Sequence, residues 1–160
     1  MVFATMRKRK ILMDSVAYNA MITACGNHGE WKMALKIKEV MCREGFEPDH
    51  YTYSALVSAF DKGDEGERVS SLFQDMVAMV ESLPSRQERR KFTAPFNAVM
   101  KYHAGAGTTG AGLHVFGTMA KLGVERNKIT FTTLITSLVN NGDYESIIRI
   151  FKETPSHENT

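Results

Sequence analysis

The chain has 160 residues, enough for one ordinary globular domain, and 43% of them are hydrophobic, which is enough to bury a core. Its net charge of +2 does not by itself indicate a nucleic-acid-binding protein, so such a function would have to rest on local basic clusters. The two cysteines make no disulfide framework, the five histidines have no metal-ligand spacing, and no apolar run is long enough to span a membrane. Cys25 and Cys42 fall in segments with a helical pattern, where we expect buried thiols.

The first fourteen residues are basic through Arg7–Lys10 but lack the apolar stretch of a secretory signal. An organellar transit peptide would be longer and richer in serine, so we do not interpret this segment as a targeting sequence. Residues 2–6, VFATM, resemble VFGTM at residues 115–119. Residues 1–14 are therefore predicted to be the tail of a preceding, incomplete repeat, which suggests a longer array.

The next unit has the pattern of two helices joined by a turn. The first helix is predicted over about residues 16–25, and the second over about residues 31–43. Gly29 lies between them, where a residue without a Cβ can adopt the left-handed conformation that ends a helix. Gly45 and Pro48 end the second helix.

This unit recurs three times along the chain. Each copy starts with an aromatic residue, then a small polar residue, a small residue and two apolar residues; the aromatic residues are Tyr18, Tyr53, Phe96 and Phe131. Gly29 recurs as Gly107 and Gly142, while the second copy has Asp64 at that offset. Apolar residues spaced three and four apart place one apolar face on each second helix.

A hairpin of this length cannot bury its apolar face alone, but stacked hairpins bury a continuous core. We therefore predict an all-α fold, a right-handed α-solenoid of helix-turn-helix repeats of 35 residues. The predicted divisions are a tail at 1–14, repeats at 15–49, 50–92 and 93–127, and a fourth repeat with a polar tail at 128–160.

The second repeat is eight residues longer than the others, and its second helix is predicted to run on to about Leu83 and Pro84. Four of the seven residues at 85–91 are basic: Arg86, Arg89, Arg90 and Lys91. Two interpretations stay open, a contact to phosphate or to an acidic protein partner, and a solvated loop without a ligand. Either way, the insertion should widen or kink the groove beside it.

The first repeat, with Val16–Ile22 (VAYNAMI) at its start and Gly45–Asp49 (GFEPD) at its end, resembles the pentatricopeptide repeat family. The tetratricopeptide repeat fits less well, because its pattern needs a glycine where this chain has Ile22, Val57, Met100 and Ile135. The resemblance covers nearly the whole chain. It implies that each repeat reads one base of a single-stranded RNA with side chains that line a concave groove.

In that family, the polar residue after the first aromatic and the last residue of the repeat set the choice of base. The resemblance implies base-reading roles for Asn19 with Asp49, for Asn97 with Asn127, and for Ser54 and Thr132. The first pair would favour uracil, and the second a pyrimidine, more often cytosine. Phe92 closes the second repeat and cannot hydrogen-bond a base edge. The residues implied to sandwich the bases are Val16, Tyr51, Ala94 and Ile129.

The same residues have a purely structural interpretation. Asparagine and aspartate near the start of a helix are frequent N-caps, so Asn19, Asp49, Asn97 and Asn127 could simply stabilise helix ends. Register across the repeats favours base reading, but only as far as the family resemblance holds.

The resemblance therefore implies a binding module for single-stranded RNA in organellar RNA processing or translation, in a mitochondrion or chloroplast. The alternative is a protein-protein scaffold subunit of a large organellar complex, such as a ribosome or a membrane-bound energy complex. We expect no enzyme activity, catalytic residue, cofactor, metal, small-molecule substrate or membrane insertion, because the chain has no nucleophile-base pair or metal cluster. The glycine-rich run Gly105–Gly110 lacks the lysine of a phosphate loop and falls at a predicted hairpin turn.

Overall fold

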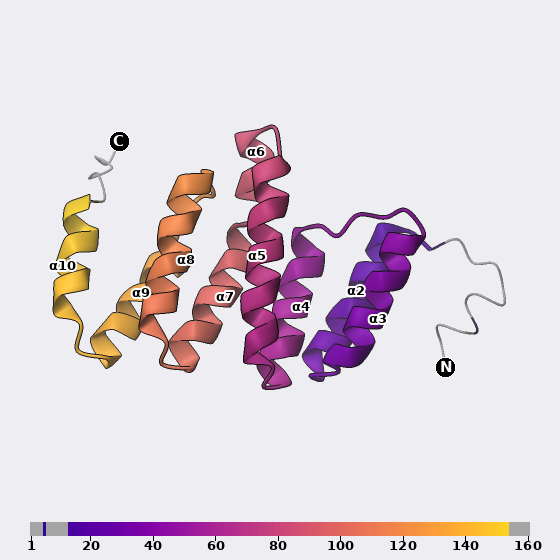
Figure 1. Ribbon diagram of the computed structural model, residues 1–160, viewed down its shortest axis with the longest axis horizontal. Helices are drawn as coiled ribbons and strands as arrows, with labels where there is room; N and C mark the ends of the chain where they lie inside the picture. The colour runs from indigo at the N-terminus through magenta and orange to yellow at the C-terminus, as the bar shows by residue number, and fades with distance from the viewer. Residues whose placement is uncertain (1–4, 6–12, 154–160) are drawn as a thin grey trace. The chain divides into compact units, whose positions relative to one another are not determined.

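A computed structural model describes residue 5 and residues 13–153 of the chain. The described residues form α-helices joined by short turns, with no strand among them (Figure 1). The helices are α2 (Ser15–Asn27), α3 (Trp31–Arg43), α4 (His50–Lys62), α5 (Gly66–Ser82), α6 (Arg86–Arg90), α7 (Thr93–Gly105), α8 (Thr109–Leu122), α9 (Lys128–Asn140) and α10 (Tyr144–Glu153). The all-α class predicted from the sequence is confirmed. The tail predicted at 1–14 lies mostly outside the described residues.

The chain divides into two compact units, Met1–Leu72 and Phe73–Thr160. In the first unit, α2 packs against both α3 and α4. Tyr18 and Ile22 of α2, Met41 of α3 and Leu56 of α4 are buried and form its core. The contact between α2 and α4 is close, because a Cβ added at Gly26 would lie 2.7 Å from the backbone oxygen of Ala55.

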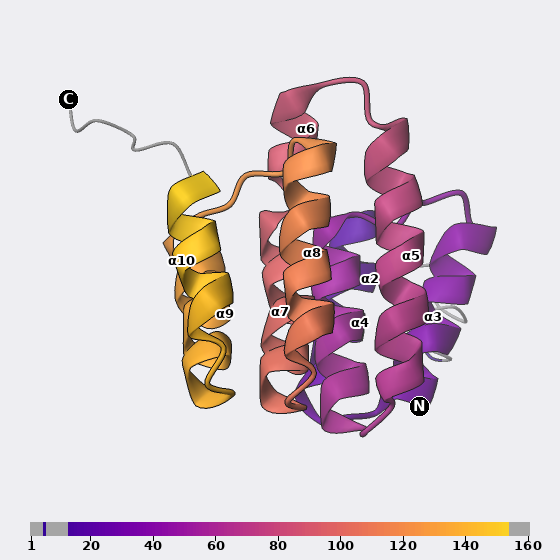
Figure 2. The same cartoon turned by 60° about the vertical axis from the view of Figure 1, so that its left-hand side comes forward.

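In the second unit, α7 packs against α8 and α9, and α9 lies beside α10 (Figure 2). Aromatic pairs join consecutive hairpins here. The rings of Phe73 and Phe96 meet edge to face with centroids 5.7 Å apart, and those of Phe116 and Phe131 do so at 5.3 Å. Such geometry adds about 0.5–1.5 kcal/mol beyond the burial of the rings.

The turn inside each hairpin uses one left-handed residue. Gly29, Gly107 and Gly142 have φ angles of 69°, 70° and 70°, as the glycine pattern predicts. Asp64 takes the same place in the second repeat with φ of 57°. The repeated glycine is therefore a conformational requirement of the turn, which an aspartate meets at some steric cost.

Three local expectations from the sequence are wrong. The segment interpreted as a solvated loop in the insertion forms a short helix, α6, because the Ser85 side chain caps it at the Glu88 amide. Cys42 is exposed rather than buried, because the residues that α3 buries are Ala34, Ile37 and Met41, and Cys25 is only partly buried. On α10, Ile148 and Phe151 are exposed although their spacing places them near the apolar face.

Candidate functional site

The first predicted base-reading pair forms a hydrogen-bonded cluster in the first unit. The Asn19 side chain on α2 is buried, and its Nδ2 donates to Asp49 Oδ1 and Oδ2 at 3.0 and 3.2 Å. The Thr52 hydroxyl on α4 donates to Asn19 Oδ1 at 2.6 Å. The amide of Asn19 is thus held in one orientation by Asp49, the last residue of the first repeat, and by Thr52 at the start of the second.

Asp49 also caps α4. Its Oδ1 accepts from the backbone amides of Tyr51 and Thr52, each at 3.0 Å, and the Thr52 hydroxyl accepts from the Asp49 amide at 3.1 Å. This reciprocal arrangement is a capping box. The capping interpretation therefore holds for Asp49, and it does not exclude base reading, because Oδ2 accepts only from Asn19 among the hydrogen bonds of the described residues.

The second pair repeats the arrangement in the second unit. Asn97 on α7 is buried, its Nδ2 donates to Asn127 Oδ1 at 3.1 Å, and the Thr130 hydroxyl donates to Asn97 Oδ1 at 2.7 Å. Asn127 caps α9 by accepting from the Thr130 amide at 3.1 Å, again in a capping box. The two clusters therefore share one geometry although they lie in different units.

The two clusters differ in the hydrogen-bonding groups that remain available to a ligand. Asp49 carries a carboxylate, which can only accept hydrogen bonds when ionised. The Oδ1 of Asn127 accepts hydrogen bonds from Asn97 Nδ2 and from the Thr130 amide, and its Nδ2 donates to no residue that the structure describes. The first cluster thus offers an acceptor, and the second offers a donor.

A cavity of about 460 Å³ lies beside the Asn97 cluster. One wall is a stripe of α7 in which residues three and four apart share a face: Ala94, Asn97, Ala98 and Lys101. Thr93, at the start of α7, also lines this cavity. The other wall comes from the start of α9 and from the insertion; its residues are Asn127, Ile129, Thr133, Arg90 and Lys91. The volume is within the range of known ligand sites.

The four residues predicted to sandwich bases are all accessible. Val16, Tyr51 and Ile129 are 71%, 64% and 61% exposed, which is unusual for side chains of this size and character. Ala94 is exposed too, and with Ile129 it lines the cavity. Their exposure leaves them available for stacking on a base, while their roles stay predictions.

The remaining predicted readers, Ser54 and Thr132, make none of the hydrogen bonds of these clusters. Ser54 is half-buried on α4, and Thr132 is exposed on α9. Phe92 is buried at the start of α7, so its ring serves the core of the second unit. Neither Ser54 nor Thr132 has a side-chain hydrogen bond like that of Asn19 or Asn97 among the described residues.

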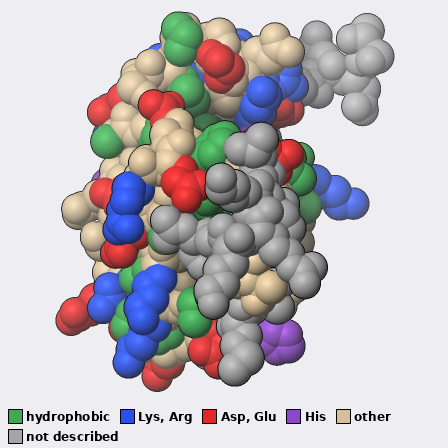
Figure 3. Space-filling model, turned by 90° about the vertical axis from the view of Figure 1, so that its right-hand side faces the viewer, with side chains coloured by type: hydrophobic (Ala, Val, Ile, Leu, Met, Phe, Trp, Pro, Cys, Tyr) green, Lys and Arg blue, Asp and Glu red, His purple; other side chains and the backbone are tan. Residues whose placement is uncertain are grey.

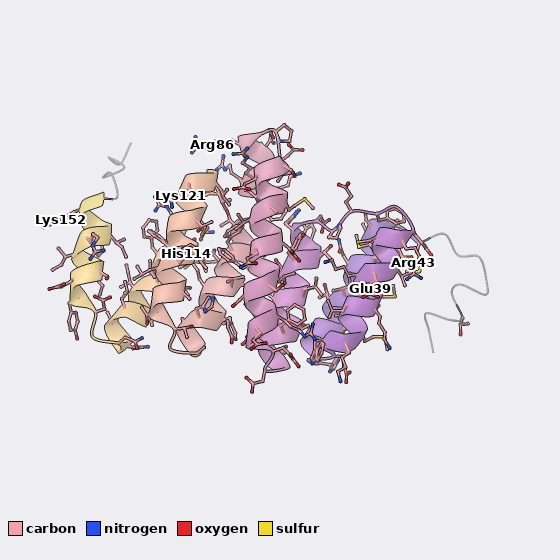
Figure 4. All side chains as sticks on the ribbon, viewed as in Figure 1. Glu39, Arg43, Arg86, His114, Lys121 and Lys152 are labelled. Atoms are coloured by element: carbon pink, nitrogen blue, oxygen red, sulfur yellow. The ribbon has the colours of Figure 1, made fainter. Side chains whose placement is uncertain are left out.

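The four basic residues of the insertion have different surroundings. The guanidinium of Arg89 is partly buried and donates to the backbone oxygens of Leu83 and Leu122, so it ties the insertion to the end of α8. Arg90 forms an ion pair with Glu125. Arg86 is exposed at the start of α6 (Figure 4), and Lys91 is exposed and lines the cavity. The predicted basic cluster is thus divided between structural and accessible cations.

Positive and negative side chains lie close together among the described residues. The hydrogen bond from Arg90 holds the pKa of the Glu125 carboxyl below its usual value. Figure 3 shows lysine and arginine interspersed with aspartate and glutamate on the face it presents. His103 is bonded to the Thr108 hydroxyl at 2.8 Å in a hairpin turn, and burial lowers the pKa of its imidazole. Within the described residues, no group of metal-binding side chains is present, and no helix is both long and apolar enough to cross a membrane.

Thr52, Thr130 and Lys101 are among the residues of these sites that were not singled out from the sequence. Thr52 and Thr130 orient the asparagines, and Lys101 lines the cavity. The threonines follow Asp49 and Asn127 at the three-residue spacing of a capping box, so that spacing could have found them. Lys101 follows Asn97 by four residues, which places both on one helical face.

Comparison with known proteins agrees with this architecture. Residues 13–62 match the model of the PPR repeat family, and residues 114–155 match that of the pentatricopeptide repeat domain. A crystal structure of the pentatricopeptide repeat protein PPR10 in complex with an 18-nt psaJ RNA element superposes with a TM-score of 0.70 at 19% identity, over 94% of this chain and 22% of that one. PPR10 from maize gives 0.69 at 18% identity, over 96% and 21%.

Relatives from Arabidopsis thaliana are also similar. A putative pentatricopeptide repeat-containing protein is 23% identical over 92% of this chain and 46% of its own length. One named as mitochondrial is 27% identical over 89% of this chain and 17% of its own length. One named as chloroplastic is 20% identical over 86% and 15%. The chain therefore spans less than half the length of these relatives.

Proposed function

The chain belongs to the pentatricopeptide repeat family, and from that membership we propose that it is a binding module for single-stranded RNA. The observation that carries the proposal is the repeated cluster of Asn19 with Asp49 and of Asn97 with Asn127. In each, a buried asparagine is oriented by the last residue of its own repeat and by a threonine at the start of the next, beside exposed apolar side chains. A cap alone needs neither the asparagine on the first helix of the repeat nor the exposed apolar residues.

The two clusters suggest different base preferences. The Asp49 carboxylate can accept from the N3–H of uracil, whereas it would repel the unprotonated N3 of cytosine, which is itself an acceptor. The Nδ2 group of Asn127 can donate to cytosine N3 or to a pyrimidine O2. The chemistry therefore supports uracil at the first cluster and a pyrimidine, more often cytosine, at the second.

Val16 with Tyr51, and Ala94 with Ile129, would pack on the two faces of the bases. Their exposed fractions suit that role, because a base placed between them would cover apolar area that is otherwise in water. Stacking contributes about 1–3 kcal/mol per base. With two well-formed clusters, we expect weak binding by this chain alone.

An organellar role in RNA processing or translation is part of the proposal. It is supported by relatives whose names place them in mitochondria or chloroplasts, and by the PPR10 structure determined with an RNA element. Localisation of a fluorescent fusion of the natural full-length protein would test this part directly.

A second candidate is a scaffold that holds a protein subunit. It is favoured by the buried Phe92, which removes a base-reading side chain from the close of the second repeat, and by the net charge of only +2. In that case the exposed apolar residues would contact a partner peptide instead of bases.

To test RNA binding, fluorescently labelled U-rich, C-rich and A-rich oligonucleotides are titrated with the chain at a stated salt concentration. Pyrimidine-rich strands should bind more tightly than A-rich strands. The paired variant Asn19→Ala with Asn97→Ala should lose this preference while keeping its helical circular dichroism. Absence of binding to every strand at low salt would overturn the proposal and leave the scaffold role.

A further inference from the structure

Three cations line the cavity beside the Asn97 cluster: Arg90 and Lys91 from the insertion, and Lys101 from α7. Among the described residues that line this cavity, none is acidic. Lys91 and Lys101 are exposed and form no ion pair with a described residue. The cavity is therefore positively charged in a chain whose charges are otherwise nearly balanced.

The cations lie on both sides of the base-reading amide along α7. Lys91 comes two residues before the helix begins at Thr93, Asn97 lies on the first turns, and Lys101 is one turn further on. From Ala94 to Lys101 the helix advances about 10 Å at 1.5 Å per residue. A strand whose base meets Asn97 would thus have its backbone within reach of a long, flexible cationic side chain on either side.

The cluster in the first unit has no such cations at the same register. Counting from Asn19 as from Asn97, the places of Lys91 and Lys101 are taken by Met13 and Thr23. The first cluster instead carries the carboxylate of Asp49. The positive charge is therefore a property of the second cluster and of the insertion, and not of the repeat pattern.

We propose that Lys91 and Lys101 form a subsite for the phosphodiester backbone of the RNA bound at Asn97 and Asn127, so that the insertion adds a phosphate contact to this one repeat. The inference rests on the proposed RNA-binding function. It assigns the insertion a role in affinity, because phosphate contacts carry no information about base identity.

Arg90 also lines this cavity, but its guanidinium is paired with Glu125. Its ion pair with Glu125 joins two exposed side chains, and such pairs contribute little to stability. A phosphate entering the cavity competes with Glu125 for this guanidinium. Arg86 does not line the cavity, and Arg89 is bonded to backbone oxygens, so these two are outside the subsite.

An RNA phosphate fits these cations better than an acidic protein does. The same cavity combines cations with an oriented amide, an unengaged Nδ2 donor on Asn127 and the exposed side chain of Ile129. A nucleotide has a charged part, a hydrogen-bonding edge and an apolar face in one unit, which matches this combination. An acidic peptide would use the lysines and leave the amide and the apolar side chain without a role.

The test measures affinity for a labelled C-rich oligonucleotide between 50 and 200 mM salt. Each phosphate contact on single-stranded nucleic acid contributes a salt slope of about 0.7, so two contacts make about a sevenfold difference over this range. Between 50 and 200 mM salt, the unchanged chain should therefore lose affinity by a factor about seven times larger than the double variant Lys91→Gln with Lys101→Gln does. The control, Lys36→Gln with Lys121→Gln, removes the same charge from exposed positions outside the cavity and should keep the original slope.

A third variant, Glu125→Gln, releases Arg90 and should add about 0.7 to the salt slope, so that this variant loses about threefold more affinity over the same range than the unchanged chain. Equal slopes for the cavity and control variants, with the pyrimidine preference still lost in the paired variant Asn19→Ala with Asn97→Ala, would overturn the subsite and leave the proposed RNA-binding function intact. If the variant Lys91→Gln with Lys101→Gln loses a binding to polyglutamate peptide that the unchanged chain has, while its RNA binding is unchanged, the phosphate subsite is overturned in favour of an acidic partner. No RNA binding by the unchanged chain would overturn both the subsite and the proposed function.

Discussion

The Asn19 and Asn97 clusters have the same hydrogen bonds but differ in charge and packing. In both, a threonine hydroxyl from the next repeat and the capping residue that closes the asparagine's own repeat hold the amide of a buried asparagine. The first cluster has a carboxylate, and the contact of α2 with α4 next to it is so close that it leaves no room for a Cβ at Gly26. The second has an amide and opens on a cationic cavity. The two repeats therefore hold the asparagine by the same hydrogen bonds, but they differ in the charge and the space that a ligand would meet.

The largest expected effect tests the difference in packing. Ala34 on α3 and Gly112 on α8 share one offset in the repeat, but Ala34 is fully buried, while a Cβ at Gly112 would meet only Leu134 Cδ1 at 4.0 Å. We expect Ala34→Leu to lower the free energy of unfolding by about 3 kcal/mol, the upper end for an overpacked core. Gly112→Ala should raise it by about 1 kcal/mol, because alanine favours the helix and has ordinary contacts there.

Thermal and urea unfolding of both variants measures these changes. An unchanged melting temperature for Ala34→Leu would contradict the register assigned to the second helices. Destabilisation by Gly112→Ala would mean that the second unit is packed as tightly at this offset as the first.

The next effect tests the similarity of the clusters. Thr52→Val and Thr130→Val each remove a hydroxyl that donates to a buried asparagine oxygen and accepts from the capping residue's amide. Each loss leaves buried polar groups without a partner, and we expect about 2 kcal/mol of destabilisation in both cases. The comparison is between the two variants: if their costs in urea unfolding differ by more than about 1 kcal/mol, the clusters are not equivalent.

Serine at the same positions is the control. Thr52→Ser and Thr130→Ser keep the hydroxyl and lose only a methyl group, so they should recover most of the lost stability. If serine is as costly as valine, the burial of the methyl group and not the hydrogen bond stabilises these helix starts.

The same clusters show which features of the fold and of the site could be predicted from the sequence alone. The aromatic anchors and turn glycines recur in register, so helix order, the bounds of α3 and the left-handed turns could be predicted. The orientation of Asn19 could not, because it depends on Thr52 and Asp49, which approach it only after two hairpins have stacked. Charge alone could not separate Arg89, bonded to backbone oxygens, from Lys91, which lines the cavity.

Exchanging the capping residues tests the difference in chemistry. Asp49→Asn gives the first cluster the amide of the second, and Asn127→Asp does the reverse. Both residue types are good N-caps, so stability should change little. The first exchange should shift preference at its position from uracil towards cytosine and the second in the opposite direction, each by about tenfold, or about 1.4 kcal/mol, within the 1–3 kcal/mol that a good bidentate base contact discriminates. Titration with oligonucleotides that differ at one pyrimidine measures the shift.

The smallest expected effect concerns the turns that set the hairpin geometry. Asp64 is the one non-glycine residue with a positive φ angle among the described residues, whereas its counterparts at Gly29, Gly107 and Gly142 are free of the Cβ that disfavours this conformation. Asp64→Gly should therefore raise the free energy of unfolding by about 0.5–1 kcal/mol, since aspartate tolerates the left-handed region better than most residues but still less well than glycine. The matched change Gly107→Asp places an aspartate at an equivalent turn with φ of 70° and nothing within 4 Å of the new Cβ, so it should cost a similar amount through backbone strain alone. If Asp64→Gly instead destabilises the chain, the aspartate side chain contributes to the turn of the second repeat, and that turn is not equivalent to the other three.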